Sequence, residues 1–213
     1  MKRILLILSI LLLGHQAFAL DVIPTRVSVR FMGTLGVYQA ADGVVLRQGP
    51  GEKYPVIHSI QWKGNDIFPE PMSAEELFVV YIPSKGFALF AVTDETEDWV
   101  EVIYNNKTGA KGWIHKDDPY KFMSWVYFFN AYGKKYGLNM LNGVPEKVLE
   151  IHSAPEDASQ VIGRINHPQK INLNVIRGNW ALVNVYDMDR IPKTGFVRWR
   201  GEDGTKYFFP AVK

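Results

Sequence analysis

Two stretches of the chain share one pattern of apolar and polar positions. Residues 44–60 (VVLRQGPGEKYPVIHSI) and 149–165 (LEIHSAPEDASQVIGRI) match at a constant offset of 105 residues. In each stretch apolar residues first alternate with polar ones, which predicts a half-buried strand. A small residue and a proline then predict a turn, and an apolar pair predicts a second strand. A repeat of this kind constrains the architecture of the whole chain.

The repeat continues further along the chain. Residues 99–102 (WVEV) correspond to residues 180–183 (WALV), and residues 112–114 (GWI) correspond to residues 195–197 (GFV). Short apolar segments separated by turns predict a mainly β chain. The pattern therefore predicts two halves that are built alike.

The order of these motifs resembles that of the bacterial SH3-like (SH3b) domain family. The match rests on residues 46–50 (LRQGP), 99–102 and 112–114, and it covers about residues 37–116 and 149–199. The second half departs from the family pattern, since His152 replaces the arginine and Ala154 replaces the glycine. The resemblance implies two small SH3-like β-barrels in tandem. It also implies a structural part for Arg47, Gly49, Pro50, Trp99 and Trp180, with Arg47 holding the turn through a hydrogen bond or an ion pair.

The segments around the first copy of the repeat add further elements. Alternation predicts strands at residues 26–31 and 33–38. An insertion at about residues 61–86 enlarges the first half, with a capping box at residues 73–76 and a hairpin between residues 77–82 and 87–92. A further hairpin turn is predicted at residues 105–109. The insertion either makes a specific contact or covers an open sheet edge.

Residues 118–143 are expected to form a helical connector between a first domain (residues 20–117) and a second (residues 144–213). Asp118 and Pro119 suit the start of a helix, which is predicted over residues 119–132. Five apolar residues recur at helical spacing: Phe122, Trp125, Val126, Phe129 and Tyr132. This stripe is either a ligand platform or, as the pattern favours, a packing face that clamps the two barrels together.

Residues 1–19 are typical of an export signal that is removed. Lys2 and Arg3 precede an apolar run, and Ala17-Phe18-Ala19 forms a cleavage site. The run is too short for a stable membrane anchor, so we expect an exported protein, periplasmic or secreted. The leader holds two of the 24 basic residues, and the mature chain therefore carries 22 basic and 22 acidic residues. This balance gives no support for nucleic-acid binding.

The sequence contains no recognisable catalytic or metal centre. The absence of cysteine excludes a thiol nucleophile. Outside the leader, His58, His115, His152 and His167 are not at metal-ligand spacing, and alternation places His58 and His152 on the outward side of strands. No Gly-x-Ser-x-Gly elbow and no glycine-rich phosphate loop is present. We therefore expect a protein that is not an enzyme and that uses no cofactor.

Aromatic residues remain as the candidates for binding. Small barrels recognise extended peptides with exposed aromatic side chains beside a loop. The candidates are Tyr54, Tyr104, Trp113, Phe196 and Trp199, each of which could instead belong to the core. The expected function is recognition of a peptidoglycan peptide or of another extended peptide. The alternative is a scaffold that contacts an envelope protein through the insertion and the aromatic connector.

Overall fold

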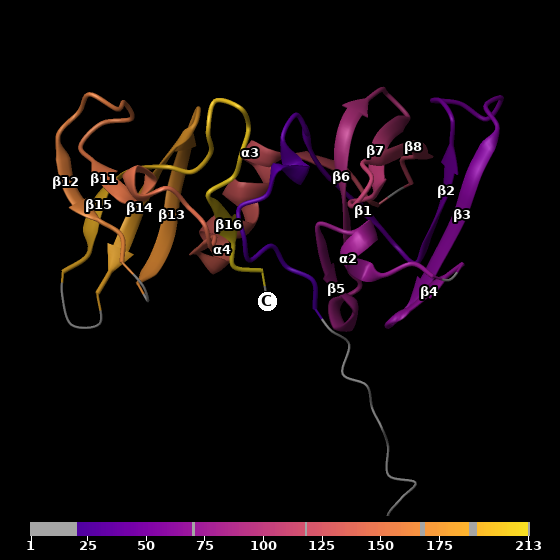
Figure 1. The fold of residues 1–213 in the computed structure, drawn as a ribbon, viewed down its shortest axis with the longest axis horizontal. Coiled ribbons are helices and arrows are strands. Elements are labelled where there is room, and N and C mark those ends of the chain that lie inside the picture. The colour runs from indigo at the N-terminus through magenta and orange to yellow at the C-terminus, as the bar shows by residue number, and fades with distance from the viewer. Residues whose placement is uncertain (1–20, 70, 118, 167–168, 188–190, 213) are drawn as a thin grey trace, which may run out of the picture.

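The computed structural model describes residues 21–69, 71–117, 119–166, 169–187 and 191–212. The predicted export signal lies outside these described residues. The described chain is mainly β, and its two antiparallel sheets lie on either side of a central helical segment (Figure 1).

The first sheet has nine strands, in the order β4-β3-β2-β8-β7-β6-β1-β9 with β5 beside β6. The strands are β1 (Gly36–Ala40), β2 (Gly43–Arg47), β3 (Val56–Lys63), β4 (Asp66–Phe68), β5 (Val80–Ile82), β6 (Phe87–Glu95), β7 (Trp99–Asn105), β8 (Ala110–His115) and β9 (Phe122–Ser124). The hairpins predicted around residues 83–86 and 105–109 are confirmed, since β5 pairs with β6 and β7 pairs with β8.

The second sheet has seven strands, in the order β12-β11-β15-β14-β13-β10-β16. The strands are β10 (Leu138–Met140), β11 (Glu150–His152), β12 (Val161–Arg164), β13 (Lys170–Arg177), β14 (Trp180–Tyr186), β15 (Lys193–Arg198) and β16 (Phe208–Pro210). Strand for strand, this order is the same as β3-β2-β8-β7-β6-β1-β9 in the first sheet.

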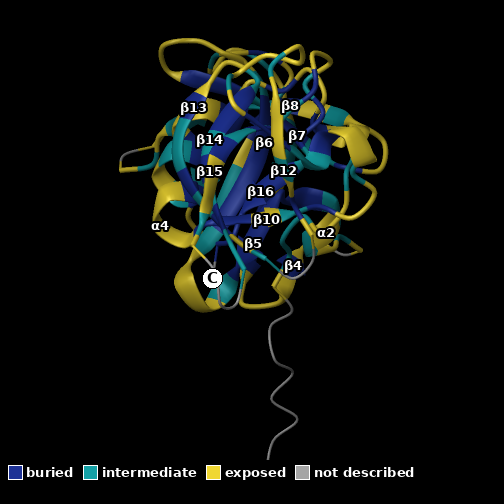
Figure 2. Ribbon diagram, turned by 90° about the vertical axis from the view of Figure 1, so that its left-hand side faces the viewer, coloured by how far each residue is buried: buried dark blue, intermediate teal, exposed yellow. Residues whose placement is uncertain are grey.

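Neither sheet closes into a barrel within the described residues. The end strands, β4 and β9 in one sheet and β12 and β16 in the other, do not pair with each other. The prediction that each half forms a closed barrel is therefore wrong for the described residues. One reason is that β16 is fully buried (Figure 2) and packs Phe209 against Trp125 and Phe129 of the central segment, so it is not free to reach β12.

The insertion of the first half contributes to the core. Its short helix α2 (Ala74–Leu77) begins with the predicted capping box, in which Ser73 and Glu76 bond each other's backbone N–H groups. The six residues 77–82 that follow are each at most 2% exposed. They include β5, which covers the free edge of β6 over residues 87–89.

The helical segment begins later than predicted. Residues 122–124 form β9 and pair with β1, so the predicted start at Pro119 is wrong; Asp118, its predicted cap, lies outside the described residues. Three short helices follow without a break: α3 (Trp125–Phe128), the π-helix η3 (Phe129–Gly133) and α4 (Lys134–Tyr136). Ser124 caps them by accepting a hydrogen bond from Tyr127 N at 3.2 Å. Gly137 ends them with a φ of 85°, a conformation that glycine adopts readily.

One buried cluster joins the two sheets through this helical segment. Val37 and Leu89 of the first sheet belong to the same cluster as Leu173 and Val183 of the second. Between them lie Trp125, Phe128 and Phe129, each at most 2% exposed, and the Phe129 ring lies 4.3 Å from that of Trp199. Trp125 and Phe129 of the predicted stripe are therefore packing residues, as the pattern favours, whereas Val126 is 39% exposed and Phe122 lies in β9.

Residues 21–35 cross between the two halves instead of forming the strand predicted at residues 26–31. Val22 pairs with Tyr81 in the first half, and Arg26 pairs with Asn142 near the second. The alternating residues then end in a 3₁₀ turn, η1 (Val29–Phe31), whose Phe31 packs against Trp125. Val27 and Phe31 of this segment pack on the shared core without pairing along a sheet, whereas Val29 is 73% exposed.

A lysine from the second half enters this junction. Lys206 is 3% exposed, donates a hydrogen bond from Nζ to the Phe31 carbonyl at 2.8 Å and lies 4.4 Å from the centre of the Trp125 ring. Burial, with the positive Arg200 nearby, lowers the pKa of Lys206 to about 7, although Asp203 opposes the shift. The two halves therefore share a buried ionisable group as well as an apolar core.

Candidate functional site

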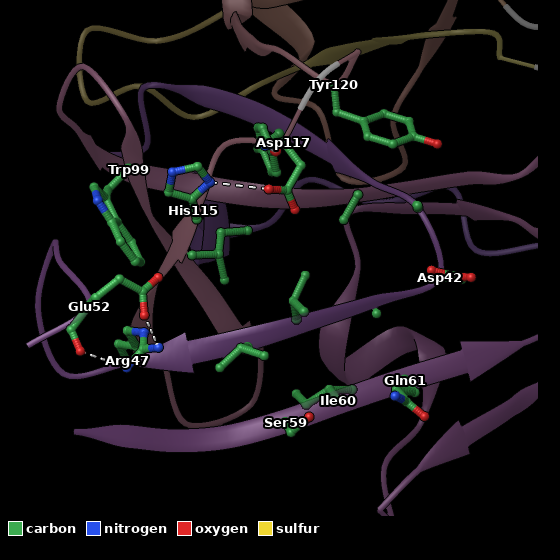
Figure 3. Close-up of a pocket in the computed structure, with 17 residues that line it drawn as sticks. Asp42, Arg47, Glu52, Ser59, Ile60, Gln61, Trp99, His115, Asp117 and Tyr120 are labelled. Atoms are coloured by element: carbon green, nitrogen blue, oxygen red, sulfur yellow. Dashed lines mark hydrogen bonds and ion pairs between the residues drawn. The ribbon is translucent and has the colours of Figure 1, made fainter. Parts of the chain in front are cut away.

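The first sheet holds a cavity of about 630 Å³ beside the strand ends of β2 and β8 (Figure 3). Its lining comes from β1, β2, β3, β7 and β8 and from the segment that leads to β9. Aromatic side chains and charged side chains of both signs contribute to it, among them Tyr38, Asp42, Trp99, His115 and Tyr120. A surface of this composition suits a polar ligand with some apolar area.

Arg47 forms one wall of the cavity. It comes from the last position of β2, where the repeat motif ends the strand and begins a turn. Its guanidinium donates hydrogen bonds to the carbonyls of Glu52 (3.1 Å) and Tyr54 (2.9 Å) and forms an ion pair with the Glu52 carboxylate. These contacts tie the two ends of the turn together, and they are of the kind that the family resemblance implies for Arg47.

Trp99 and His115 face each other across the β7–β8 hairpin, where they are register partners. Their rings meet edge to face, with centroids 5.1 Å apart and an interplanar angle of 85°. His115 Nδ1 donates to the Asp117 carboxylate at 3.1 Å, and Asp117 N donates to the Tyr38 hydroxyl at 2.8 Å. These contacts hold the imidazole between Trp99 and Asp117 (Figure 3).

The opposite end of the cavity is marked by Asp42 and Gln61 (Figure 3). Asp42 lies in the exposed turn between β1 and β2, and among the described residues its carboxylate makes no hydrogen bond or ion pair. The cavity thus has one end where charges are paired and another where a carboxylate is open to a ligand.

A smaller cavity of about 240 Å³ lies in the second sheet, lined by His152, Asp157, Trp180 and Arg198 among others. The Arg198 guanidinium lies 4.7 Å from the Trp180 ring centre and pairs with Asp157 at 2.7 Å and Glu202 at 2.9 Å. Burial lowers the pKa of Arg198, but these carboxylates outweigh it and the pKa lies above its usual value. His152 is 3% exposed, so its expected place on the outer surface is wrong.

The predicted binding aromatics lie outside both cavities. Tyr54, Tyr104, Trp113 and Phe196 are half-buried. Tyr54 packs on Gly49, the Tyr104 ring lies 5.1 Å from that of His58, and Arg177 lies 5.9 Å from the Phe196 ring. Trp199 is fully buried and bonds the Gly178 carbonyl at 3.0 Å, so its assignment as a binding residue is wrong and it belongs to the core.

Two residues expected to be structural, Arg47 and Trp99, line the larger cavity, and Trp180 lines the smaller one. Gly49 is buried beneath the Tyr54 ring, and Pro50 lies exposed in the same turn. Sequence reasoning missed His115, Asp117 and Asp42. Regular pairing outward from the hairpin turn at residues 105–109 would set Lys116 opposite Trp99. A bulge between Ile103 and Asn105 shifts the register by one residue and sets His115 there instead.

Comparison of the sequence with models of known protein families and with curated proteins finds no match. Among the described residues, no three His, Asp or Glu side chains lie together in an arrangement that could hold a metal ion. No helix in the described part of the chain is long and apolar enough to cross a membrane. The function therefore has to be argued from the cavities themselves.

Proposed function

We propose that the chain is an exported, non-enzymatic binding protein that holds an extended peptide, such as the peptide of the bacterial cell wall, in the cavity of its first sheet. The observation that carries this proposal is the cavity of about 630 Å³ between Trp99 and Asp42. A peptide chain presents both polar backbone groups and side chains, and this lining offers partners for both.

The repeated strand order supports an SH3-like relation for both halves. The two sheets share seven strands in the same order, and the turn-holding arginine of the family pattern makes the contacts that the pattern implies. We propose that the halves are tandem copies of an SH3-like unit, opened where they meet the central helical segment. In such units, ligands bind beside the loops that the strands support.

The charge of the cavity favours a peptide that carries an amine. The lining includes three carboxylates, Asp42, Glu52 and Asp117, against the single guanidinium of Arg47. The formal charges of these four side chains sum to two negative charges. The unpaired Asp42 carboxylate is accordingly the contact that we assign to a ligand ammonium group.

Binding of the mature chain to purified peptidoglycan and to a synthetic stem peptide with a free side-chain amine tests this proposal. Asp42→Asn and His115→Ala should each weaken peptide binding by tenfold or more, and acetylation of the peptide amine should reproduce the effect of Asp42→Asn. Ile191→Ala, at a side chain that is 92% exposed and outside the cavity, serves as the control. Equal binding by all four proteins, or absence of binding by the unaltered chain, would refute the proposal.

A scaffold that binds an envelope protein has less support. This alternative depends on the insertion and on the aromatic stripe of the helical segment. Residues 77–82 and Trp125, Phe128 and Phe129 are buried inside the chain. Phe68 of the insertion is 54% exposed and Val126 of the stripe is 39% exposed, so only a few apolar side chains of these two features are accessible to a partner. Crosslinking in cells tests the scaffold. It would be favoured if the unaltered chain recovers one protein partner, and if a variant in which residues 64–75 are replaced and the cavity lining is intact no longer recovers it.

A further inference from the structure

The two cavities occupy equivalent places in the two sheets. In the first sheet, β2 pairs Arg47 with Trp113, and β7 pairs Trp99 with His115 on β8. In the second sheet, β11 pairs His152 with Phe196, and β14 pairs Trp180 with Arg198 on β15. Because the strand orders match, Arg47 corresponds to His152, and His115 corresponds to Arg198.

Arginine and histidine are therefore exchanged between two equivalent positions. The first sheet has arginine at the end of β2 and histidine at the end of β8, whereas the second sheet has histidine on β11 and arginine on β15. The exchange leaves each sheet with one arginine and one histidine beside the tryptophan that opens β7 or β14.

The contacts of these residues are also retained. The tryptophan and histidine rings lie 5.1 Å apart in both sheets, Trp99 with His115 and Trp180 with His152. Each arginine forms an ion pair with a carboxylate from the turn after β2 or β11, Arg47 with Glu52 and Arg198 with Asp157. Glu52 and Asp157 themselves stand 105 residues apart, at the offset of the repeat.

Packing alone does not explain this second set of polar groups. A histidine that is 3% exposed and a partly buried arginine cost desolvation, and apolar residues of similar size would fill the same space at lower cost. The groups moreover border an open cavity, which an apolar core would have closed. A shared ligand chemistry accounts for the same four groups beside a cavity in both sheets.

We propose that the second sheet carries its own peptide-binding site, formed by His152, Asp157, Trp180 and Arg198. Lys147 lines this cavity at the offset of the repeat from Asp42, so the site has no counterpart of the Asp42 contact to a ligand ammonium group. This inference rests on the proposed function of the first cavity. The second cavity has a volume of about 240 Å³ against about 630 Å³, so it takes a shorter part of the peptide. The chain is then bivalent, and the shared core holds its two sites at a constant separation.

The histidines provide one reporter for each site. In protein labelled with ¹³C in the imidazole rings, the signals of His115 and His152 are assigned with His115→Gln and His152→Gln, and the unaltered chain is titrated with the synthetic stem peptide. Both signals should shift, at peptide concentrations that differ between the sites. Arg198→Met removes the guanidinium and keeps an unbranched apolar stem. It should raise the peptide concentration that half-shifts the His152 signal at least tenfold and leave that for His115 unchanged.

The possible results separate this inference from the proposed function. A shift of His115 alone in the unaltered chain would overturn the second site and leave the first cavity as the binding site. Shifts of neither histidine would overturn both. An equal loss at both histidines in Arg198→Met would show that Arg198 acts through the fold, and would also overturn the second site. The titration of the unaltered chain decides the matter even where the variant does not fold.

Discussion

Lys206 provides the most direct test of the physical reasoning, because its charge is buried where the two halves meet. Its pKa of about 7 lies below the ordinary 10.5 mainly because of burial. The folded state therefore releases this proton more readily than the unfolded state. Below pH 7 both states carry the proton and the folded state bears the full cost of a buried charge. Between pH 7 and 10.5 the unfolded state alone keeps it, so stability rises with pH across this window.

The magnitude follows from the difference in pKa. Each unit is worth about 1.4 kcal/mol, which places an upper bound of about 5 kcal/mol on the change. The contact with the Trp125 ring favours the charged form and offsets about 1–2 kcal/mol of it. We therefore expect about 3 kcal/mol. The charged groups that influence Lys206 are Arg200, which lowers its pKa, and Asp203, which raises it.

The experiment compares the unaltered chain with Lys206→Met in urea unfolding at pH 6, 7, 8 and 9. The methionine fills the same space, and the Phe31 carbonyl keeps a hydrogen bond from Thr34 Oγ1 at 2.6 Å. The free energy of unfolding of the variant relative to the unaltered chain should fall by about 1–2 kcal/mol between pH 6 and 9, with the rest of the change above pH 9. Parallel pH profiles for the two proteins would refute the reasoning, since they would mean that Lys206 does not titrate in this range.

Three further substitutions, Phe129→Ala, Gly49→Ala and Ser73→Ala, test two packing contacts and one helix cap. Phe129→Ala should cost about 3–5 kcal/mol in urea unfolding because Phe129 is fully buried between both halves, whereas Tyr127→Ala, at a side chain 62% exposed, should change stability by less than about 0.5 kcal/mol. Gly49→Ala should cost about 1–3 kcal/mol, because a Cβ there would lie 2.7 Å from the Tyr54 ring; adding Tyr54→Ser should recover most of this loss of thermal stability, and no recovery would show that the contact is not the cause. Ser73→Ala should cost about 1 kcal/mol through loss of the cap of α2, and an unchanged melting temperature would contradict it.

Local patterns predicted the elements whose residues bond to near neighbours. The capping box at Ser73 and the hairpin at residues 105–109 depend on residues a few positions apart, and both are present. The alternation of residues 26–31 was misleading because Val27 and Phe31 pack on the core shared by the two halves instead of pairing along a sheet. The helix was predicted too early because residues 122–124 are recruited by β1, more than 80 residues away in the sequence.

The site was less predictable than the fold. The cavity exists because β2 pairs with β8, which joins Arg47 to a strand 66 residues further on. No local pattern encodes that approach, so Trp99 was expected in a structural part and His115 was not considered for binding. The exchange of Arg47 and His115 for His152 and Arg198 was also hidden, because aligning one motif at a time presents His152 only as a departure from the family pattern.

The cluster that includes Val37, Phe129 and Phe209 belongs to neither sheet alone. A cut in the exposed turn at Asn142 and Gly143 would leave each fragment with an uncovered apolar face, since the partner that buries it would be on the other piece. We expect such fragments to aggregate when made separately and to recover a native complex when refolded together. The protein thus has two repeated halves in its sequence but a single unit of folding.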